Sequence, residues 1–234
     1  MREVANIPAD AEGTFLERPN RFLGVVRLGG DRVPVHVHDP GRLGEILFPG
    51  NRVLLRRATS ARRKTRWDLV AGRCEGHWVL VHSGYHRKIA ETMLSSEELS
   101  PLGEVESLRA EVGYHQSRLD FLAQVDGKRV WIETKGCTLC RDGVALFPDA
   151  PTVRGRRHME HLRELRMKGD RAAALILVFR PDAQCFAPNA DTDPGFATAF
   201  WMAVEAGVEV YPLLLGFSPP ALHYLGKIPL KEER

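Results

Sequence analysis

The sequence has few cysteines and no long apolar run. Four cysteines in 234 residues are too few for a disulfide framework, and the single Cys137-x-x-Cys140 pair lacks the second pair of a typical zinc site. No stretch approaches the roughly 20 apolar residues of a transmembrane helix. The N-terminus, MREVANIPADAEG, has no apolar signal segment. We therefore expect a reduced, cytoplasmic protein that does not enter a membrane.

Neither sign of charge dominates the chain. Lys and Arg total 33 and Asp and Glu total 30, a formal charge of +3, which permits an anionic partner without requiring one. The distribution is less even, because the segment from Asn51 to Arg73 is strongly basic and its one acid is Asp68. Its loop ATSARRKTRW, with Arg62, Arg63 and Lys64, fits a nucleic-acid surface and a solvated charged loop equally well.

Two kinds of pattern divide the chain. Residues 1–83 contain short β-rich runs separated by Gly, Pro and Asn, which predicts a small OB-like β-barrel. Residues 84–234 contain helical and strand patterns in turn. Helices are predicted near 85–99, 152–168 and 193–207, and strands near 107–114, 120–135, 170–180 and 208–216. The predicted fold class is α/β (α+β overall), a barrel followed by an αβββαβ domain with a mixed sheet.

The stretch DFLAQVDGKRVWIETK, residues 120–135, predicts a hairpin with functional side chains. A two-residue turn at Asp126-Gly127 places Asp120 opposite Glu133, with Lys135 on the same face. The other face would carry apolar residues, namely Leu119, Phe121, Ala123, Val125, Val130 and Ile132. Two carboxylates roughly 5 Å apart repel each other unless a cation lies between them.

Such a trio suits phosphodiester hydrolysis. Asp120 and Glu133, with the backbone carbonyl of Thr134, would bind Mg²⁺ or Mn²⁺, and Lys135 would orient the nucleophile or stabilise charge on the phosphate. The alternative is an ordinary cross-strand ion-pair set, in which Lys135 and Arg118 neutralise the two acids.

Two further groups of residues are candidate binding sites. Arg154, Arg157 and His158 lie at the start of a predicted helix, where basic side chains and free N–H groups suit a phosphate backbone; an amphipathic surface helix is the alternative. His36 and His38 share one face of a predicted strand, but the sequence indicates no third metal ligand.

Several motifs together resemble a known family. SRLDF, ETKG, FPDAPTVRGRRH and DTDPGFATAFWMAVEAG are similar to segments of the sugar fermentation stimulation protein (SfsA) family, within the PD-(D/E)XK nuclease-like superfamily. The resemblance implies an OB-fold joined to a nuclease-like domain, with DNA binding as the associated activity. Carried over, the acidic pair and lysine fall on Asp120, Glu133 and Lys135, a first-helix acid on Glu91, and the basic motif on Arg154, Gly155 and His158. The family's Asn-Thr-Gly-Arg-Met stretch reads HDPGRL here, which keeps only Gly41-Arg42.

The sequence thus predicts a DNA-binding protein with a magnesium-dependent nuclease site in its second domain. The alternative, which the family's name and its link to sugar use in bacteria favour, is a regulator of sugar metabolism genes that binds DNA without cutting it. The predicted nucleic-acid contacts are Arg154, His158, Arg157, Arg118, Arg42, Arg62, Arg63 and Lys64. We expect duplex DNA as the partner and a homodimer as one form of the protein.

Overall fold

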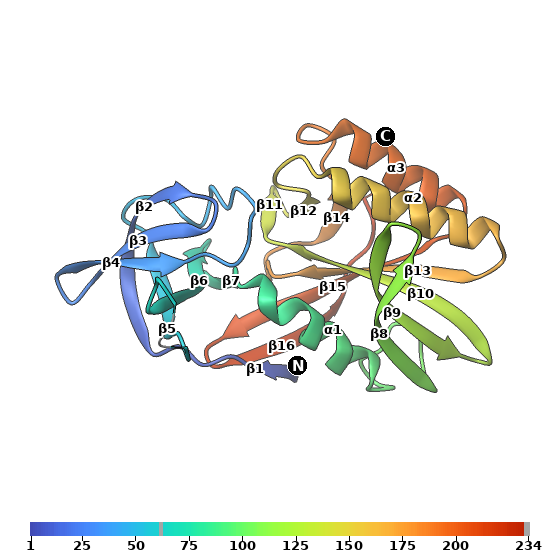
Figure 1. Cartoon of the computed structure of the whole chain (residues 1–234), viewed down its shortest axis with the longest axis horizontal. Helices are drawn as coiled ribbons and strands as arrows, with labels where there is room; N and C mark the ends of the chain where they lie inside the picture. Colours follow the sequence, from blue (N-terminus) through green and yellow to red (C-terminus); the bar gives the residue numbers. More distant parts are fainter. Residues whose placement is uncertain (61–62, 232–234) are drawn as a thin grey trace.

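The computed structural model describes residues 1–60 and 63–231. It shows two lobes side by side, a small β-barrel at one end and an α/β lobe at the other (Figure 1). Among the described residues, no helix has the length and apolar character needed to cross a membrane.

The first lobe is a closed barrel. It is built from β2 (Ala11–Asn20), β3 (Leu23–Leu28), β4 (Asp31–His36), β5 (Arg52–Arg57) and β6 (Trp67–Cys74). The strands follow the order β4-β3-β2-β5-β6, and pairing of β4 with β6 at Val35 and Trp67 closes the ring. Inward apolar side chains, among them Phe15, Val26 and Leu69, fill its interior. The predicted OB-like barrel is confirmed.

The second lobe is a mixed sheet covered by helices. Its central strands run in the order β15-β13-β10-β9-β8, with β15, β13 and β10 parallel and β9 and β8 antiparallel to their neighbours. These strands are β8 (Ser107–Tyr114), β9 (Ser117–Val125), β10 (Lys128–Cys137), β13 (Arg171–Val178) and β15 (Glu209–Ser218). In β13, RAAALILV, every residue after the first is buried, as expected of a central parallel strand. The predicted α/β domain is therefore confirmed.

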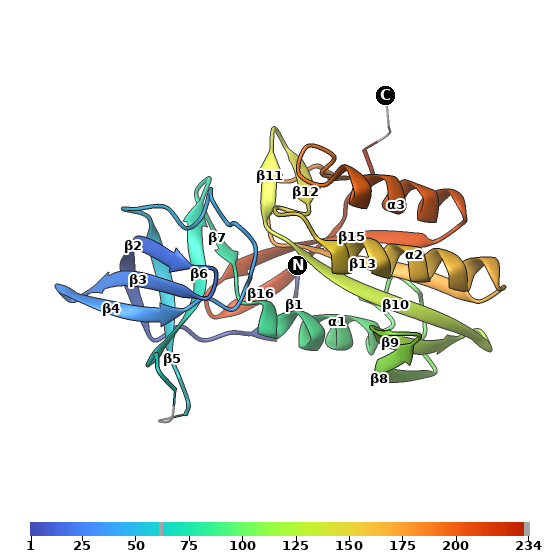
Figure 2. The ribbon, with the colours of Figure 1, turned by 45° about the horizontal axis from the view of Figure 1, so that its top comes forward.

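Helices cover the two faces of this sheet. On one face, α1 (His86–Leu94), which follows the 3₁₀ turn η1 (Ser83–Tyr85), packs Ile89 and Met93 into a core that is continuous with the barrel interior. On the other face, α2 (Val153–Met167) and α3 (Pro194–Glu205) bury Met159 and Phe200 in a second core. Figure 2 shows α2 and α3 lying together on the side of the sheet away from α1.

Several strands were not predicted from the sequence. A small separate sheet contains β11 (Leu139–Arg141), β12 (Val144–Phe147) and β14 (Cys185–Pro188). The strands β16 (Ala221–Lys227) and β1 (Arg2–Asn6), also not predicted, pair with each other, and β16 pairs with β15 as well. The strand β7 (His77–Leu80), which lies in one of the predicted β-rich runs of the first domain, also pairs with β15. One sheet therefore runs through both lobes, and the predicted boundary after residue 83 stays a prediction.

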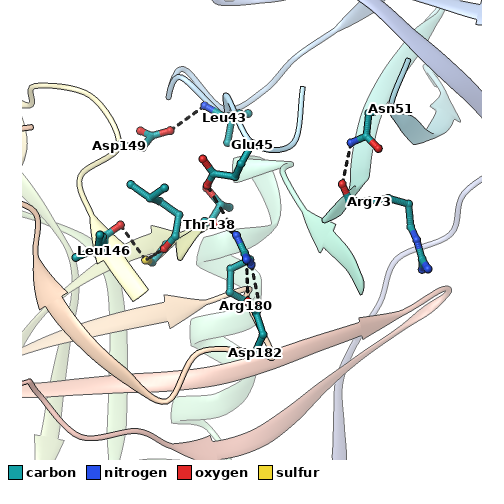
Figure 3. Close-up of polar contacts among 11 residues, drawn as sticks. Leu43, Glu45, Asn51, Arg73, Thr138, Leu146, Asp149, Arg180 and Asp182 are labelled. Atoms are coloured by element: carbon teal, nitrogen blue, oxygen red, sulfur yellow. Dashed lines mark hydrogen bonds and ion pairs between the residues drawn. The ribbon is translucent and has the colours of Figure 1, made fainter. Parts of the chain in front are cut away.

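Polar contacts fix the barrel against the second lobe (Figure 3). The backbone N–H of Leu43 donates to Asp149 at 3.0 Å. Arg180, two residues after β13 and only 2 % exposed, lies 3.9 Å from the carboxylate of Glu45 in the first lobe and donates to Asp182 at 2.7 Å. The two lobes are held by buried charge and backbone contacts as well as by apolar packing.

Candidate metal and phosphate site

The predicted hairpin has the predicted register. Five pairs, from Val125 with Lys128 to Phe121 with Ile132, follow the two-residue turn. One detail is wrong: Leu119 packs in the core beneath α2, with Met159, and not in the core that contains Phe121. The alternation of side chains breaks at this point, opposite Glu111 of β8, whose φ of 55° lies in the left-handed region.

The end of the hairpin ladder brings Asp120 and Glu133 together. Beyond the Phe121–Ile132 pair, the Asp120 side chain takes the place of a strand partner, and its Oδ2 accepts the backbone N–H of Thr134 at 2.7 Å. The N–H and C=O of one strand residue point to the same side, so the Thr134 carbonyl faces Asp120 as well. The aspartate of β9 and the glutamate and this carbonyl of β10 therefore lie near one another at the end of the ladder.

Glu133 is buried and holds two partners on one oxygen. It is 2 % exposed, and its Oε1 contacts both the Nζ of Lys135 and the Nδ1 of His158. These two nitrogen atoms are 3.3 Å apart. The other oxygen, Oε2, is buried and has no hydrogen-bond partner within the described part of the chain. A buried carboxylate oxygen without a partner is costly unless a ligand completes it.

His158 belongs to the first turns of α2. This helix starts where Thr152, its N-cap residue, accepts the backbone N–H of Gly155 at 3.0 Å. The Nε2 of His158 accepts from the Nε of Arg154 at 3.4 Å, so its Nδ1–H is the donor toward Glu133. Arg154 and His158, one helical turn apart, are thus joined to the acidic pair.

Burial and neighbouring charges act in opposite directions on the two acids. Burial and the nearby Glu133 raise the pKa of Asp120 above its ordinary value. Burial also opposes ionisation of Glu133, but Lys135 and the hydrogen bond from His158 outweigh it and lower its pKa. Glu133 is therefore the fixed anion of the site, and Asp120 is the acid that a cation would most help to ionise.

A pocket of about 410 Å³ opens over these residues and extends to the barrel. Besides the acids and Lys135, the barrel's Asp39 and Pro40 and the α1 residue Arg87 line it. Asp39 and Arg87 were not predicted as site residues, because their position depends on how the lobes pack. Burial raises the pKa of Asp39 to about 6, with Asp149 adding to the effect.

The donor set fits a divalent cation. Two carboxylate oxygens are free of the hydrogen bonds described, Oδ1 of Asp120 and the buried Oε2 of Glu133, and the Thr134 carbonyl faces the same side. Oxygen ligands of this kind suit hard cations such as Mg²⁺, Mn²⁺ and Ca²⁺. Glu91, predicted as a further ligand, is exposed on α1 and is not among the residues lining the pocket, so its role stays a prediction.

The predicted nucleic-acid contacts fall in two places. Arg154 and Arg157 are exposed at the start of α2, beside the pocket; Arg42 is exposed on the barrel segment that adjoins it. Arg118 is exposed and lies 3.0 Å from Glu111. Lys64 is exposed in the segment between β5 and β6. The end of β5 and the start of β6, which border this segment, project from the barrel away from α2 (Figure 2).

Arg62 and Arg63 belong to the same basic segment as Lys64. Arg63 donates to Asp68 through both terminal nitrogens, so its charge is largely matched inside the barrel. Arg62 lies outside the described residues.

Comparisons with known proteins agree with this architecture. Residues 16–81 match the SfsA N-terminal OB domain, and residues 84–220 match the sugar fermentation stimulation protein RE domain. The chain is 45 % identical over 236 residues to a sugar fermentation stimulation protein homolog of Methanococcoides burtonii, covering 98 % of this chain and 96 % of the relative. It is 48 % identical over 227 residues to the homolog of Thermotoga neapolitana, covering 97 % and 98 %.

A solved structure has the same fold along the whole chain. Pyrococcus furiosus SfsA, determined in complex with Ca²⁺, superposes with a TM-score of 0.91 at 28 % sequence identity, covering 99 % of this chain and 100 % of the other. The relatives include archaeal proteins, so this family is not restricted to bacteria. With both domains matched and relatives aligned over nearly the full length, the chain belongs to the sugar fermentation stimulation protein family.

Proposed function

We propose that this protein binds DNA and cleaves phosphodiester bonds at Asp120, Glu133 and Lys135 with the help of Mg²⁺ or Mn²⁺. The observation that carries the proposal is the Oε2 atom of Glu133, a buried carboxylate oxygen that has no partner among residues 1–60 and 63–231 and lies beside a second carboxylate on a pocket wall. A divalent cation bound there would polarise a phosphate oxygen and lower the pKa of a bound water. The Ca²⁺ in Pyrococcus furiosus SfsA supports a preference for hard cations.

The protein's own residues have distinct roles in this proposal. Lys135 is held on Glu133 at the edge of the pocket, so its ammonium group faces any phosphate that enters. Arg154 lines the same pocket and exposed Arg157 lies within the first turns of α2, where the helix also presents free N–H groups. These groups contact phosphate without reading bases, which fits binding of little sequence preference.

Duplex DNA is the expected partner. The exposed arginines at the start of α2 give affinity through phosphate contacts, which a duplex presents on both strands. A homodimer would present one site to each strand.

A non-cleaving DNA-binding regulator is the second candidate. It is favoured by the contacts on Oε1 of Glu133, because Lys135 neutralises this acid and His158 donates a hydrogen bond to it without any metal. In that case binding would fall steeply with salt, and no divalent cation would produce strand breaks.

Cleavage assays with matched variants separate the two. Wild type, Asp120→Asn and Glu133→Gln are incubated with supercoiled and single-stranded DNA over a range of Mg²⁺ and Mn²⁺, with Glu97→Gln, an exposed acid after α1, as the control. We expect cleavage by wild type and the control and loss of it in both site variants. Cleavage that survives in both site variants would mean that the strand breaks come from elsewhere, and salt-sensitive binding without cleavage in wild type would favour the regulator.

A further inference from the structure

A second group of metal-ligand side chains lies in the barrel, outside the pocket described above. His38, just after β4, Asp68 of β6 and His82, just before η1, each offer one ligand atom, and these atoms lie within 4.8 Å of one another. The Nε2 of His38 is 2.9 Å from Oδ1 of Asp68, and the rings of His38 and His82 stack with their centroids 3.6 Å apart. Three segments distant in sequence converge on this point.

The chemistry of this group differs from that of the acidic pair. Two imidazoles and one carboxylate are a typical three-ligand set for Zn²⁺ and similar transition-metal ions, whereas the all-oxygen set at Asp120 and Glu133 suits hard cations. The Nδ1 of His82 is buried and has no hydrogen-bond partner among the described residues, so this nitrogen is not engaged in a hydrogen bond there. His36 lies next to His38, with ring centroids 4.3 Å apart, and is the nearest further imidazole.

We propose that His38, Asp68 and His82 form a binding site for one transition-metal ion of the Zn²⁺ type. The ion would join the end of β4, β6 and the segment that leads into α1. This proposal does not rest on the proposed nuclease function, because His38, Asp68 and His82 are not among the residues that line the acidic pocket. It also gives a role to His38, one of the two histidines predicted to share a strand face.

Arg63 provides a sharp test of this assignment. Its terminal nitrogens donate to Oδ2 of Asp68 at 2.9 Å and to Oδ1 at 2.5 Å, so without metal the guanidinium neutralises the carboxylate. A metal ion and Arg63 are then two cations that compete for Asp68. If Asp68 is a metal ligand, removing the guanidinium must strengthen metal binding; if the cluster is only a hydrogen-bond network, it will not.

The experiment measures binding of Zn²⁺ alone by competition with a chromophoric chelator, using tag-free full-length protein. Asp120→Asn with Glu133→Gln serves as the parent, so that the acidic pocket does not contribute. Three variants are added to it: His82→Gln, Arg63→Gln, and His77→Gln as the control, an exposed histidine at the start of β7. His82 is chosen because its Nδ1 has no partner in the described part of the chain, so its loss breaks no hydrogen bond described at that atom. Thermal unfolding of each variant verifies the fold.

We expect one equivalent of Zn²⁺ in the parent and the control, and tighter binding with Arg63→Gln. With His82→Gln the affinity should fall by more than the roughly 10- to 100-fold that the loss of an outer-sphere partner costs. Visible absorption of bound Co²⁺ reports the same ligands and should be lost in the same variant. The proposal is overturned if the parent takes up no Zn²⁺, if folded His82→Gln binds it as tightly as the parent, or if Arg63→Gln does not bind it more tightly.

Discussion

Replacing Asp39 by Asn should stabilise the protein near neutral pH and have almost no effect in acid. Asp39 lies on the barrel segment that enters the pocket, and burial, reinforced by Asp149, raises its pKa from the ordinary 3.8 to about 6. The folded protein therefore binds a proton at this carboxyl more tightly than the unfolded chain does. Stability from this group is present at low pH and is lost as the pH rises between about 4 and 6.

The size of the effect follows from the same values. A rise in pKa from 3.8 to about 6 corresponds to about 3 kcal/mol if the carboxyl were fully shielded from water. The residue is only partly buried, so we expect about 1–2 kcal/mol after solvent screening. Asn retains an oxygen that accepts the N–H of Gly41, at 2.8 Å from Asp39 in the native protein, and this contact should survive the substitution.

Urea unfolding from pH 4 to pH 8 measures the effect. The free energy of unfolding of Asp39→Asn minus that of wild type should be near zero at pH 4, rise through pH 6 and level off above pH 7. Asp31→Asn, an exposed aspartate of the same barrel, controls for the general loss of one negative charge. A difference that does not change with pH, or that is largest in acid, would refute the reasoning.

Two further substitutions test the packing of the site. Gly41→Ala should destabilise the protein by about 1–3 kcal/mol, because a Cβ there would lie 2.5 Å from both carboxylate oxygens of Asp149. Gly44→Ala is the control and should not destabilise the protein, because a Cβ there meets nothing within 4 Å. Equal urea midpoints for the two variants would contradict this prediction. His158→Ala should lower the free energy of unfolding by about 2–3 kcal/mol, because it removes a hydrogen bond to buried Glu133. The same substitution at partly exposed His161 should lower it less. A urea midpoint of His158→Ala equal to that of wild type would show that the contact is not stabilising.

The local part of the site was predictable from the sequence. Asp126-Gly127 specifies a two-residue turn, and the turn sets the register that brings Asp120 toward Glu133. The helix predicted near 152–168 and the strand predicted near 170–180 correspond to α2 and β13. Each of these inferences needs only neighbouring residues, which is why they hold.

Contacts between distant segments were not predictable. The pairing of β1 with β16 depends on the two ends of the chain meeting, and neither strand has a pattern that specifies the other. Leu119 was assigned to the wrong face because strict alternation cannot anticipate a break opposite Glu111. Asp39 and Arg87 reach the pocket only because the barrel and α1 pack beside β10.

The segment from His38 to Leu43 contributes to the histidine cluster of the barrel, to the acidic pocket and to the contact between the lobes. His38 belongs to the barrel histidine cluster, Asp39 lines the acidic pocket, and Leu43 donates to Asp149 in the second lobe. Arg18 holds this segment in place, donating to the backbone carbonyls of Asp39 at 2.9 Å and of Gly41 at 2.7 Å. An ion bound by His38 would therefore restrain the same short segment that forms one wall of the acidic pocket. Because both proposed cation sites bear on these residues, occupancy of the barrel site should alter binding at the acidic pair without any shared ligand.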